Sequence, residues 1–479
     1  MGQEIGSSHF REEDFQRFQT SLRQETNLLG EWFAQGKFSE FGKVGGFELE
    51  IWLVDEHGSP RAINDAFLKL TEARNLPVVP ELARFNVELN SEPRLLQGDV
   101  LSRMQAELEH TWRQCCELGR QIDTSLMMIG ILPTVKDSEL ILANMSDVKR
   151  FQALNDQVLR LRNGRPLEIA IDGREALHMQ HGDVMFESAA TSFQLHFQVG
   201  VSQVARYYNA AHVLSAPMVA ISANSPYLFG RDLWDETRIP LFEQAVAMED
   251  IYGREGGQAG RVTFGVNYIE SSVYECFIRN MGCYPVLLPA HSDAPPEALS
   301  HLRLHNGTIW RWNRPLIGFD ATGEPHVRIE HRVVPAGPTV VDAIANAALF
   351  FGALESMANT EVPAESQLGF EQARTNFYAA AKDGLRAELV WLNGKKIPAL
   401  ELLEQEILPM ARRGLKMLDV DEADARDFLG IIEARIKRRC NGTVWQRQYV
   451  ARHGADMQGL TRAYHERQQQ GQPVHEWSV

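Results

Sequence analysis

Cysteine is scarce in this sequence of 479 residues, which contains 5, none of them in a CxxC pair. So few cysteines exclude a small disulfide scaffold, and an odd number without pairs is typical of reduced thiols in a cytoplasm. Long apolar runs are also lacking: no stretch approaches the roughly 18 uninterrupted apolar residues of a membrane span. The amino terminus carries acidic residues where a signal peptide has its apolar segment. We therefore expect a cytoplasmic protein without a membrane partner.

Positive charge is the second shortage, because 48 Lys and Arg face 63 Asp and Glu, for a net charge of −15. Nucleic-acid binding needs a basic surface, so we expect no nucleic-acid partner. The content of 44% hydrophobic and 23% charged residues is ordinary for a globular protein and excludes disorder. An acidic surface often serves solubility alone, so the question is which acidic residues do chemistry.

Helical periodicity marks several segments of the chain. Apolar residues at helical spacing predict helices over 10–34 and 101–123, the second with Asp99 at its N-cap position. The Ala-rich segments 203–223 and 340–358 are typical of buried helices, and the last ninety residues are predicted to be all-helical. We interpret Arg435–Arg439 as a solvated helix face or a C-terminal charge cluster.

Four short segments instead alternate apolar and polar residues: 46–54, 84–92, 191–199 and 326–333. Alternation with a period of two places the polar residues of each segment on one face of a strand. We expect half-buried, antiparallel strands with helices behind the apolar face. The polar residues are Glu48 and Glu50; Asn86, Glu88, Asn90 and Glu92; Gln194, His196 and Gln198; and Arg328, Glu330 and Arg332.

These polar faces have two interpretations. They can simply meet water, as in many antiparallel sheets. However, they carry Glu, Asn, Gln and His, and Glu48 and Glu50 lie only about 7 Å apart on one strand, a repulsion that a cation would offset. Carboxylate and amide ligands favour Mg²⁺ or Mn²⁺ over zinc. Arginines beside Glu330 would suit an anionic group, and acids, cations and arginines together are what phosphoryl transfer requires.

The same segments resemble glutamate–cysteine ligase family 2 and its carboxylate–amine ligase relatives, which share the glutamine-synthetase type of active site. The family's G-x-E-x-E pattern is matched by Gly46–Glu50, and its His/Gln-x-His/Asn strand by Gln194–His196. Further matches, within about residues 40–415, include Ala-Asn-Ser-Pro at 223–226 followed by Arg238, an altered G-T-x-W-x-D-x-R-P at 307–315, and V-E-x-R at 329–332.

The resemblance implies an α+β fold with an antiparallel or mixed sheet, a polar active-site face, helices on the other face and a helical C-terminal region. It implies a glutamine-synthetase-like catalytic domain over residues 1–390, with residues 391–479 packed on it. The implied enzyme uses ATP to phosphorylate a substrate carboxylate, typically the γ-carboxylate of glutamate. An amine, cysteine or another, then attacks the acyl phosphate to give an amide.

Site residues follow from the resemblance position by position. Glu330 and Arg332 would be catalytic, and Arg314 and Trp310 would bind ATP. Arg238, His196 and Asn224 would bind substrate, although His196 is equally a candidate metal ligand or a hydrogen-bonded structural residue. The residues expected to hold Mg²⁺, or Mn²⁺, are Glu48, Glu50, Glu88, Gln194 and Glu330.

Two other functions remain open at this point. One is a catalytically inactive relative that binds nucleotide or amino acid as a ligand-binding or regulatory protein. The other is a glycosidase with two catalytic acids, which does not explain the arginines or the Gln and His residues. The expected partners are small-molecule carboxylate and amine substrates, and a homo-oligomer is left open. The glycines at 256–260 lack the Lys-Ser/Thr of a phosphate-binding loop, so we expect only a loop beside the active site.

Overall fold

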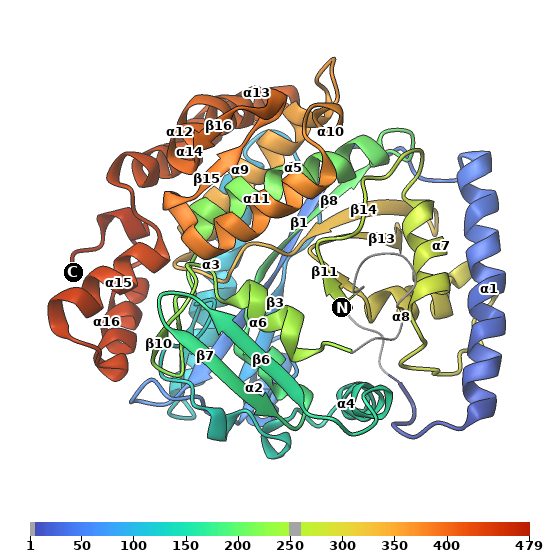
Figure 1. The fold of residues 1–479 in the computed structure, drawn as a ribbon, viewed down its shortest axis with the longest axis horizontal. Helices are drawn as coiled ribbons and strands as arrows, with labels where there is room; N and C mark the ends of the chain where they lie inside the picture. Colours follow the sequence, from blue (N-terminus) through green and yellow to red (C-terminus); the bar gives the residue numbers. More distant parts are fainter. Residues whose placement is uncertain (1–4, 249–259) are drawn as a thin grey trace.

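The computed structural model describes residues 5–248 and 260–479, so most of the glycine segment 256–260 lies outside the described residues. Its centre is one curled antiparallel sheet, a half-barrel, with strand order β13-β14-β8-β1-β3-β2 (Figure 1). The strands are β1 (Val44–Val54), β2 (Val78–Pro80), β3 (Asn86–Asn90), β8 (Phe193–Val199), β13 (Asn313–Phe319) and β14 (Pro325–His331). Two short strands, β4 (Arg94–Leu95) and β5 (Ser125–Met127), also pair with β1.

The four alternating segments of the sequence form β1, β3, β8 and β14, which lie side by side as antiparallel neighbours. Their apolar residues are buried in the core, including Leu49, Leu195 and Ile329, each 0% exposed. The predicted α+β class with an antiparallel sheet is thereby confirmed. Alternation was a sufficient signal because each of these strands buries one apolar face against helices.

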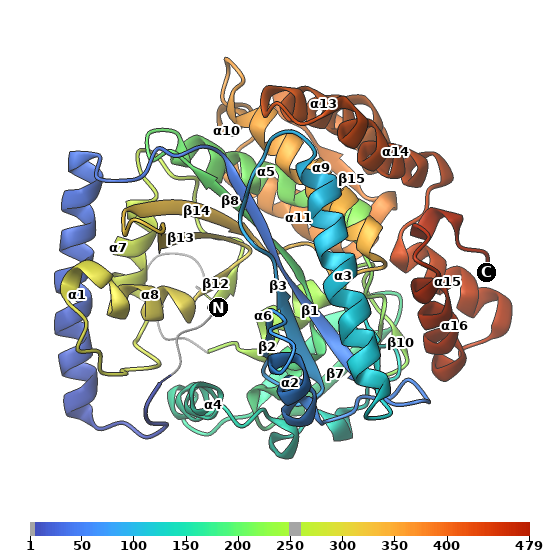
Figure 2. The ribbon, with the colours of Figure 1, turned by 180° about the vertical axis from the view of Figure 1, so that it is seen from behind.

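Long helices cover the apolar face of the sheet. They are α3 (Val100–Arg120), seen in front in Figure 2, and α5 (Val204–Ser222) and α9 (Val340–Ala358), which contact β14 and β8 respectively. The predicted helices at 101–123, 203–223 and 340–358 are confirmed. Asp99 does occupy the N-cap position of α3, but its side chain makes no capping hydrogen bond and instead pairs with Arg103 at 2.7 Å.

Among the described residues, α9 is the single helix long and apolar enough to cross a membrane. Of its most apolar window, 94% is buried inside the protein, between the sheet and the helices that follow it. Its composition is therefore that of a core helix.

A second group of elements lies on the opposite side of the sheet from α3. The hairpin of β6 (Leu167–Asp172) and β7 (Ala176–His181) and the helix α6 (Arg238–Ala245) are in front in Figure 1. Helix α1 (Glu12–Gln35), predicted at 10–34, packs against α7 (Tyr274–Cys283) and α8 (Ser300–Gly307) at one end of the molecule. The smaller elements are α2 (Asn64–Glu72), α4 (Lys149–Leu161), α10 (Ala364–Gln367), β9 (Tyr227–Leu228), β10 (Arg231–Asp232), β11 (Val262–Thr263) and β12 (Trp310–Arg311).

The C-terminal region is predominantly helical and packs on the rest of the chain. Its elements are α12 (Ala399–Leu402), α13 (Leu408–Met417), α14 (Glu422–Arg438), α15 (Gly442–His453) and α16 (Met457–Gln470). It is not all-helical as predicted, because β16 (Lys396–Pro398) pairs with β15 (Glu388–Val390) just after α11 (Phe370–Asp383). Strands of three residues are too short to show a period of two in the sequence.

The interpretation of Arg435–Arg439 as a solvated helix face is wrong for its first residue. Arg435 is 1% exposed and forms an ion pair with Asp342 of α9, which is itself fully buried. It also donates to Asn346 Oδ1 at 2.7 Å. A cluster of basic residues is typical of a surface, and no local pattern indicates an acidic partner on a helix some ninety residues away.

Candidate active site

The central part of the sheet's polar face is buried, whereas Glu50 is half-buried and Glu92 is exposed. Glu48 is 8% exposed, Gln194 2% and Glu330 1%, and Glu88 and His196 are also buried. The register explains why they meet: Glu48 lies opposite Gln194, Glu50 opposite Glu88, and His196 opposite Glu330 on neighbouring strands. The interpretation in which this face simply meets water does not hold for these residues.

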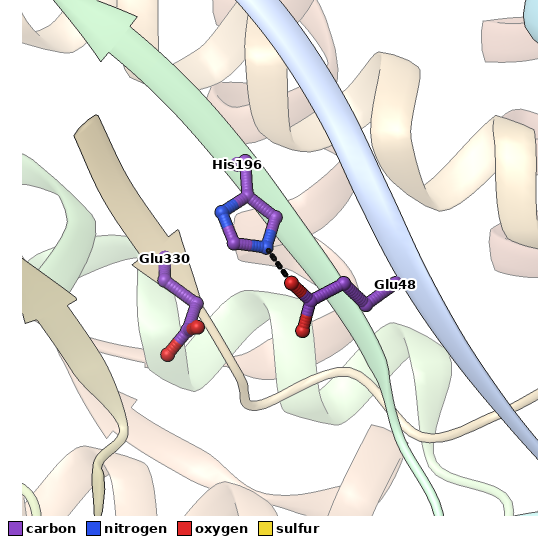
Figure 3. Close-up of side chains that lie close together, drawn as sticks. All are labelled: Glu48, His196 and Glu330. Atoms are coloured by element: carbon purple, nitrogen blue, oxygen red, sulfur yellow. Dashed lines mark ion pairs between the residues drawn. The ribbon is translucent and has the colours of Figure 1, made fainter. Parts of the chain in front are cut away.

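The first cluster joins β1, β8 and β14 through Glu48, His196 and Glu330. Figure 3 shows their side chains converging, with His196 Nε2 at 3.3 Å from Glu48 Oε1. Their potential ligand atoms all lie within 4.8 Å of one another. On its other side, His196 accepts a hydrogen bond at Nδ1 from Arg328 Nε at 3.2 Å. The structure thus brings together three residues that the sequence analysis drew from separate segments.

Arginines balance the charge of this first cluster. Arg314 binds both carboxylate oxygens of Glu330, at 2.7 Å through Nε and 2.9 Å through Nη2. Arg332 Nη1 lies 3.2 Å from Glu330 Oε2 and also donates to Gln194 Oε1. Burial by itself would raise the pKa of Glu330, but these two arginines outweigh it and lower that pKa to about 2. In the same way, His196 and Arg328 hold the pKa of Glu48 well below its ordinary value against the effect of burial.

The second cluster consists of Glu50, Glu81 and Glu88. Here the pKa values of Glu50 and Glu88 are raised, whereas those of Glu48 and Glu330 are lowered. Three carboxylates converge with ligand atoms within 4.8 Å. Burial, followed by the charge of Glu81, raises the pKa of Glu50 to about 7. Burial and the neighbouring carboxylates Glu48 and Glu81 raise the pKa of Glu88 well above its ordinary value. Nearby Glu187 has its pKa raised to about 8 for the same two reasons, burial first and then Glu81 and Glu50.

These two clusters offer ligands for divalent cations, with carboxylate oxygens in both and the imidazole of His196 in the first. Burial and then mutual repulsion raise the pKa values of Glu50 and Glu88, and a bound cation would favour their ionised forms. Arginines form ion pairs with Glu330 of the first cluster. The charges of Arg332 and Arg238 also act on Glu50, but they do not offset burial and Glu81 there, so the second cluster has the stronger need for a cation. Gln194 lies between them, with Nε2 donating to Glu50 Oε1 at 2.9 Å and Oε1 accepting from Arg332.

Two of these acidic residues, Glu81 and Glu187, were not identified from the sequence. Glu81 directly follows β2, and β2 pairs with β3 so that Val79 lies opposite Glu88. Glu187 comes from a short 3-10 turn, Val184–Ala189. The only signal for Glu81 was its position after the apolar run Val78-Val79-Pro80, and Glu187 had no signal, since neither segment shows a period.

The structure does not present every expected substrate residue to this face. Arg238 is 2% exposed; its Nε lies 3.2 Å from Glu236 Oε1, and its Nη2 donates to the carbonyls of Arg332 and Val333 at 3.2 and 2.6 Å. Arg238 therefore supports the backbone of the catalytic candidate Arg332. Asn224 is 0% exposed, and its side chain is hydrogen-bonded within the protein, which indicates a structural position.

The tryptophans near β12 divide into two environments. Trp312 is fully buried, donates to Glu243 Oε1 at 2.8 Å and packs against Phe242 and Phe377, so it is a core residue. Trp310 is half-buried, with its ring centroid 6.2 Å from that of Phe242. Of the two, only Trp310 keeps an exposed part on which an adenine ring could stack.

Comparison with known proteins agrees with this geometry. The model of the family described as glutamate–cysteine ligase family 2 (GCS2) matches residues 44–470. The structure of glutamate–cysteine ligase from Francisella tularensis in complex with AMP is similar, with 12% sequence identity and a TM-score of 0.54 over 90% of each chain. A bifunctional glutathione synthetase from Pasteurella multocida gives 11% identity and a TM-score of 0.56 over 91% of this chain, which spans only 54% of that protein. At such identities the two structures share the fold alone, and no curated protein sequence matches the chain significantly.

Proposed function

The chain belongs to glutamate–cysteine ligase family 2, a family of ATP-dependent carboxylate–amine ligases, and on this premise we propose that it joins the γ-carboxylate of glutamate to an amine through an acyl phosphate. The observation that carries the proposal is the largely buried polar face, where Arg314 and Arg332 lie beside six potential oxygen ligands: Glu48, Glu50, Glu81, Glu88, Gln194 and Glu330. Solvated strands would not bury these groups together, and a glycosidase has no use for the arginines.

The metal assignment is part of the proposal. Glu48, His196 and Glu330 would hold one Mg²⁺, and Glu50, Glu81 and Glu88 another, with Gln194 between them. Mn²⁺ would suit the same ligands. When bound, such cations would neutralise negative charge on the phosphates of ATP and on the acceptor carboxylate. Glu81 is a proposed metal ligand here, although it was not among the ligands expected from the sequence.

The arginines would act on the phosphoryl group being transferred. Arg332 is held by Glu330 and Gln194, so its planar guanidinium is already oriented before any substrate binds. Arg314 is committed to Glu330 through two hydrogen bonds and would contribute positive charge near ATP. Trp310 would stack on the adenine. The proposed substrates are small molecules, as the ligase family implies. The proposed location is the cytoplasm.

The direct test is incubation of the protein with ATP, Mg²⁺ and glutamate and a panel of amines, with ADP release and product mass as readouts. Amine-dependent ADP release with an amide product supports the proposal. Nucleotide binding by calorimetry without any product, from folded protein, would instead favour the catalytically inactive relative.

Glu330→Gln is expected to lower ADP release strongly while the protein stays folded, because the variant loses the carboxylate charge that Arg314 and Arg332 contact. Removing an electrostatic group of this kind costs about 10²–10³ in rate. Glu324→Gln, on an exposed residue just before β14, is the matched control and should keep full activity. Retained turnover in Glu330→Gln would show that the assignment of Glu330 is wrong.

A further inference from the structure

The turn Ala223–Pro226, between α5 and β9, is tied to the C-terminal helices through Asn224. The Nδ2 of Asn224 donates to the Ala336 carbonyl and to Tyr464 Oη, both at 2.8 Å. Its Oδ1 accepts from Gln446 Nε2 at 3.0 Å. Tyr464 lies on α16 and Gln446 on α15, and both are fully buried. Two residues of the C-terminal region thus fix both ends of one buried amide.

From Asn224 the hydrogen bonds continue to Arg238. The backbone N–H of Asn224 donates to Glu236 Oε2 at 2.8 Å, and Glu236 Oε1 accepts from Ser225 Oγ at 2.7 Å and from Arg238 Nε at 3.2 Å. Glu236 is 0% exposed, and burial raises its pKa although Arg238 and the hydrogen bonds oppose the shift. The Glu236 side chain is therefore held in one conformation, because losing any of these partners would leave a buried charge without a hydrogen bond.

Arg238 connects this hydrogen-bond network to the backbone of the catalytic candidate Arg332. Its Nη2 donates to the carbonyl oxygens of Arg332 and Val333, at the point where the chain leaves β14. The side chain of the same Arg332 contacts Glu330 and Gln194. The position of the Arg332 guanidinium therefore depends on a backbone that Arg238 holds.

The C-terminal helices are fitted closely to this turn. A Cβ on Gly442, the first residue of α15, would clash with Asn224 Oδ1, so a residue without a side chain is required there. The N–H of Thr443 donates to the Ala223 carbonyl at 3.0 Å, and Arg447 donates to Asp232 Oδ1 at 2.8 Å. Tyr464 Oη also donates to the Met128 carbonyl at 3.0 Å, which fixes the ring from the other side.

We propose that Gln446 and Tyr464 are positioning residues of the ligase reaction, which act through Asn224, Glu236 and Arg238 to orient Arg332. The inference rests on the proposed function and gives the C-terminal helices a part in it. A group that stabilises a transferring phosphoryl must be held closely, and small displacements by distant residues reduce turnover more than binding.

The test uses the full-length protein with Tyr464→Phe, Gln446→Met and the double variant. We expect each single variant to lower kcat about tenfold while the KM for ATP stays within about twofold, measured well below the Tm. Because both residues act through one amide, the effects should be non-additive. The kcat of the double variant should be no lower than that of the less active single variant. Tyr449→Phe is the matched control, since this ring on α15 packs on Trp445 and His453, and it should leave kcat unchanged.

Four results would overturn the inference. A lower Tm with unchanged kcat for the folded variants would show a structural role alone. Losses that multiply in the double variant would exclude a shared path through Asn224. Wild-type protein without turnover with any amine would overturn the proposed function and this inference together, whereas active wild type with fully active variants overturns only the inference. Should Tyr464→Phe fail to fold, Gln446→Met alone decides through its kcat and Tm.

Discussion

Glu330 and Glu88 lie on the same buried face, and their pKa values move in opposite directions because their neighbours differ. Two arginines contact Glu330 and lower its pKa to about 2, against the effect of burial. Burial and the carboxylates Glu48, Glu81 and Glu50 raise the pKa of Glu88. Arginine charge thus outweighs burial at Glu330, whereas the charges of Arg332 and Arg238 do not outweigh burial and repulsion at Glu50. We expect the Glu50–Glu81–Glu88 cluster to depend most strongly on a cation.

Glu81→Gln tests this dependence. Removing one of three converging carboxylates should weaken Mg²⁺ binding at least tenfold, and ADP release should fall with it, since a ligand of the cation is lost. Calorimetric titration with Mg²⁺ measures the affinity. Glu92→Gln is the control, because Glu92 is exposed beyond the end of β3 and should leave the affinity unchanged. Equal Mg²⁺ affinity in Glu81→Gln and wild type would remove Glu81 from the site.

Glu243 of α6 belongs to neither carboxylate cluster, and it makes the free energy of unfolding depend on pH. Burial raises its pKa to about 7, although hydrogen bonds from Trp312 and Tyr378 oppose the shift. A carboxyl with a raised pKa in the folded state favours folding at low pH, and that contribution is lost between about pH 4.5 and pH 7. Glu243→Gln should therefore gain about 2 kcal/mol in free energy of unfolding, relative to wild type, between pH 5 and pH 8. Urea unfolding at both pH values measures the difference, and a pH-independent difference would contradict the prediction.

At the scale of elements, α9 and α13 pack through glycine. A Cβ on Gly414 of α13 would clash with the carbonyl oxygen of Gly352 of α9, and a Cβ on Gly352 would clash with the Ala411 carbonyl. The two helices can approach this closely only because neither carries a side chain at the contact. This contact attaches the C-terminal region to the central core helix.

Gly414→Ala should accordingly lower the free energy of unfolding by about 1–3 kcal/mol, the cost of overpacking. Gly430→Ala on α14 is the matched control with the opposite sign, because open space surrounds that position and alanine favours helix by about 0.5–1 kcal/mol. Thermal or denaturant unfolding of both variants measures the two changes. A destabilisation of the same size in both variants would show that helix contact is not the cause.

Across the whole molecule, the expected boundary at residue 390 does not coincide with a break in packing. It falls between β15 and β16, which form one hairpin. Beyond it, α13 and α14 pack on α9, and Arg435 neutralises the buried Asp342. Removing one partner of a buried ion pair is strongly destabilising, by about 3–5 kcal/mol.

We therefore expect the full chain to unfold in a single thermal transition and a fragment of residues 1–390 to lack native structure. Calorimetry of the full chain and near-ultraviolet circular dichroism of the fragment are the measurements. Two separate transitions, or a fragment with the native spectrum, would establish residues 391–479 as an independent unit.

The sequence by itself determined the four polar strands, because alternation with a period of two requires only local geometry and one apolar face to bury. It thereby identified Glu48, Glu50, Glu88, Gln194 and Glu330 as residues of one face, and the long helices that cover the other. Only the tertiary structure decided that this face is buried, that Glu81 completes one carboxylate cluster and that Arg314 and Arg332 neutralise the other. It also decided that Arg238 and Asn224 lie inside the protein and that Arg435 is a buried partner of Asp342. The physical reason is that charge partners come from segments far apart in the chain, and no local pattern records which of them will meet.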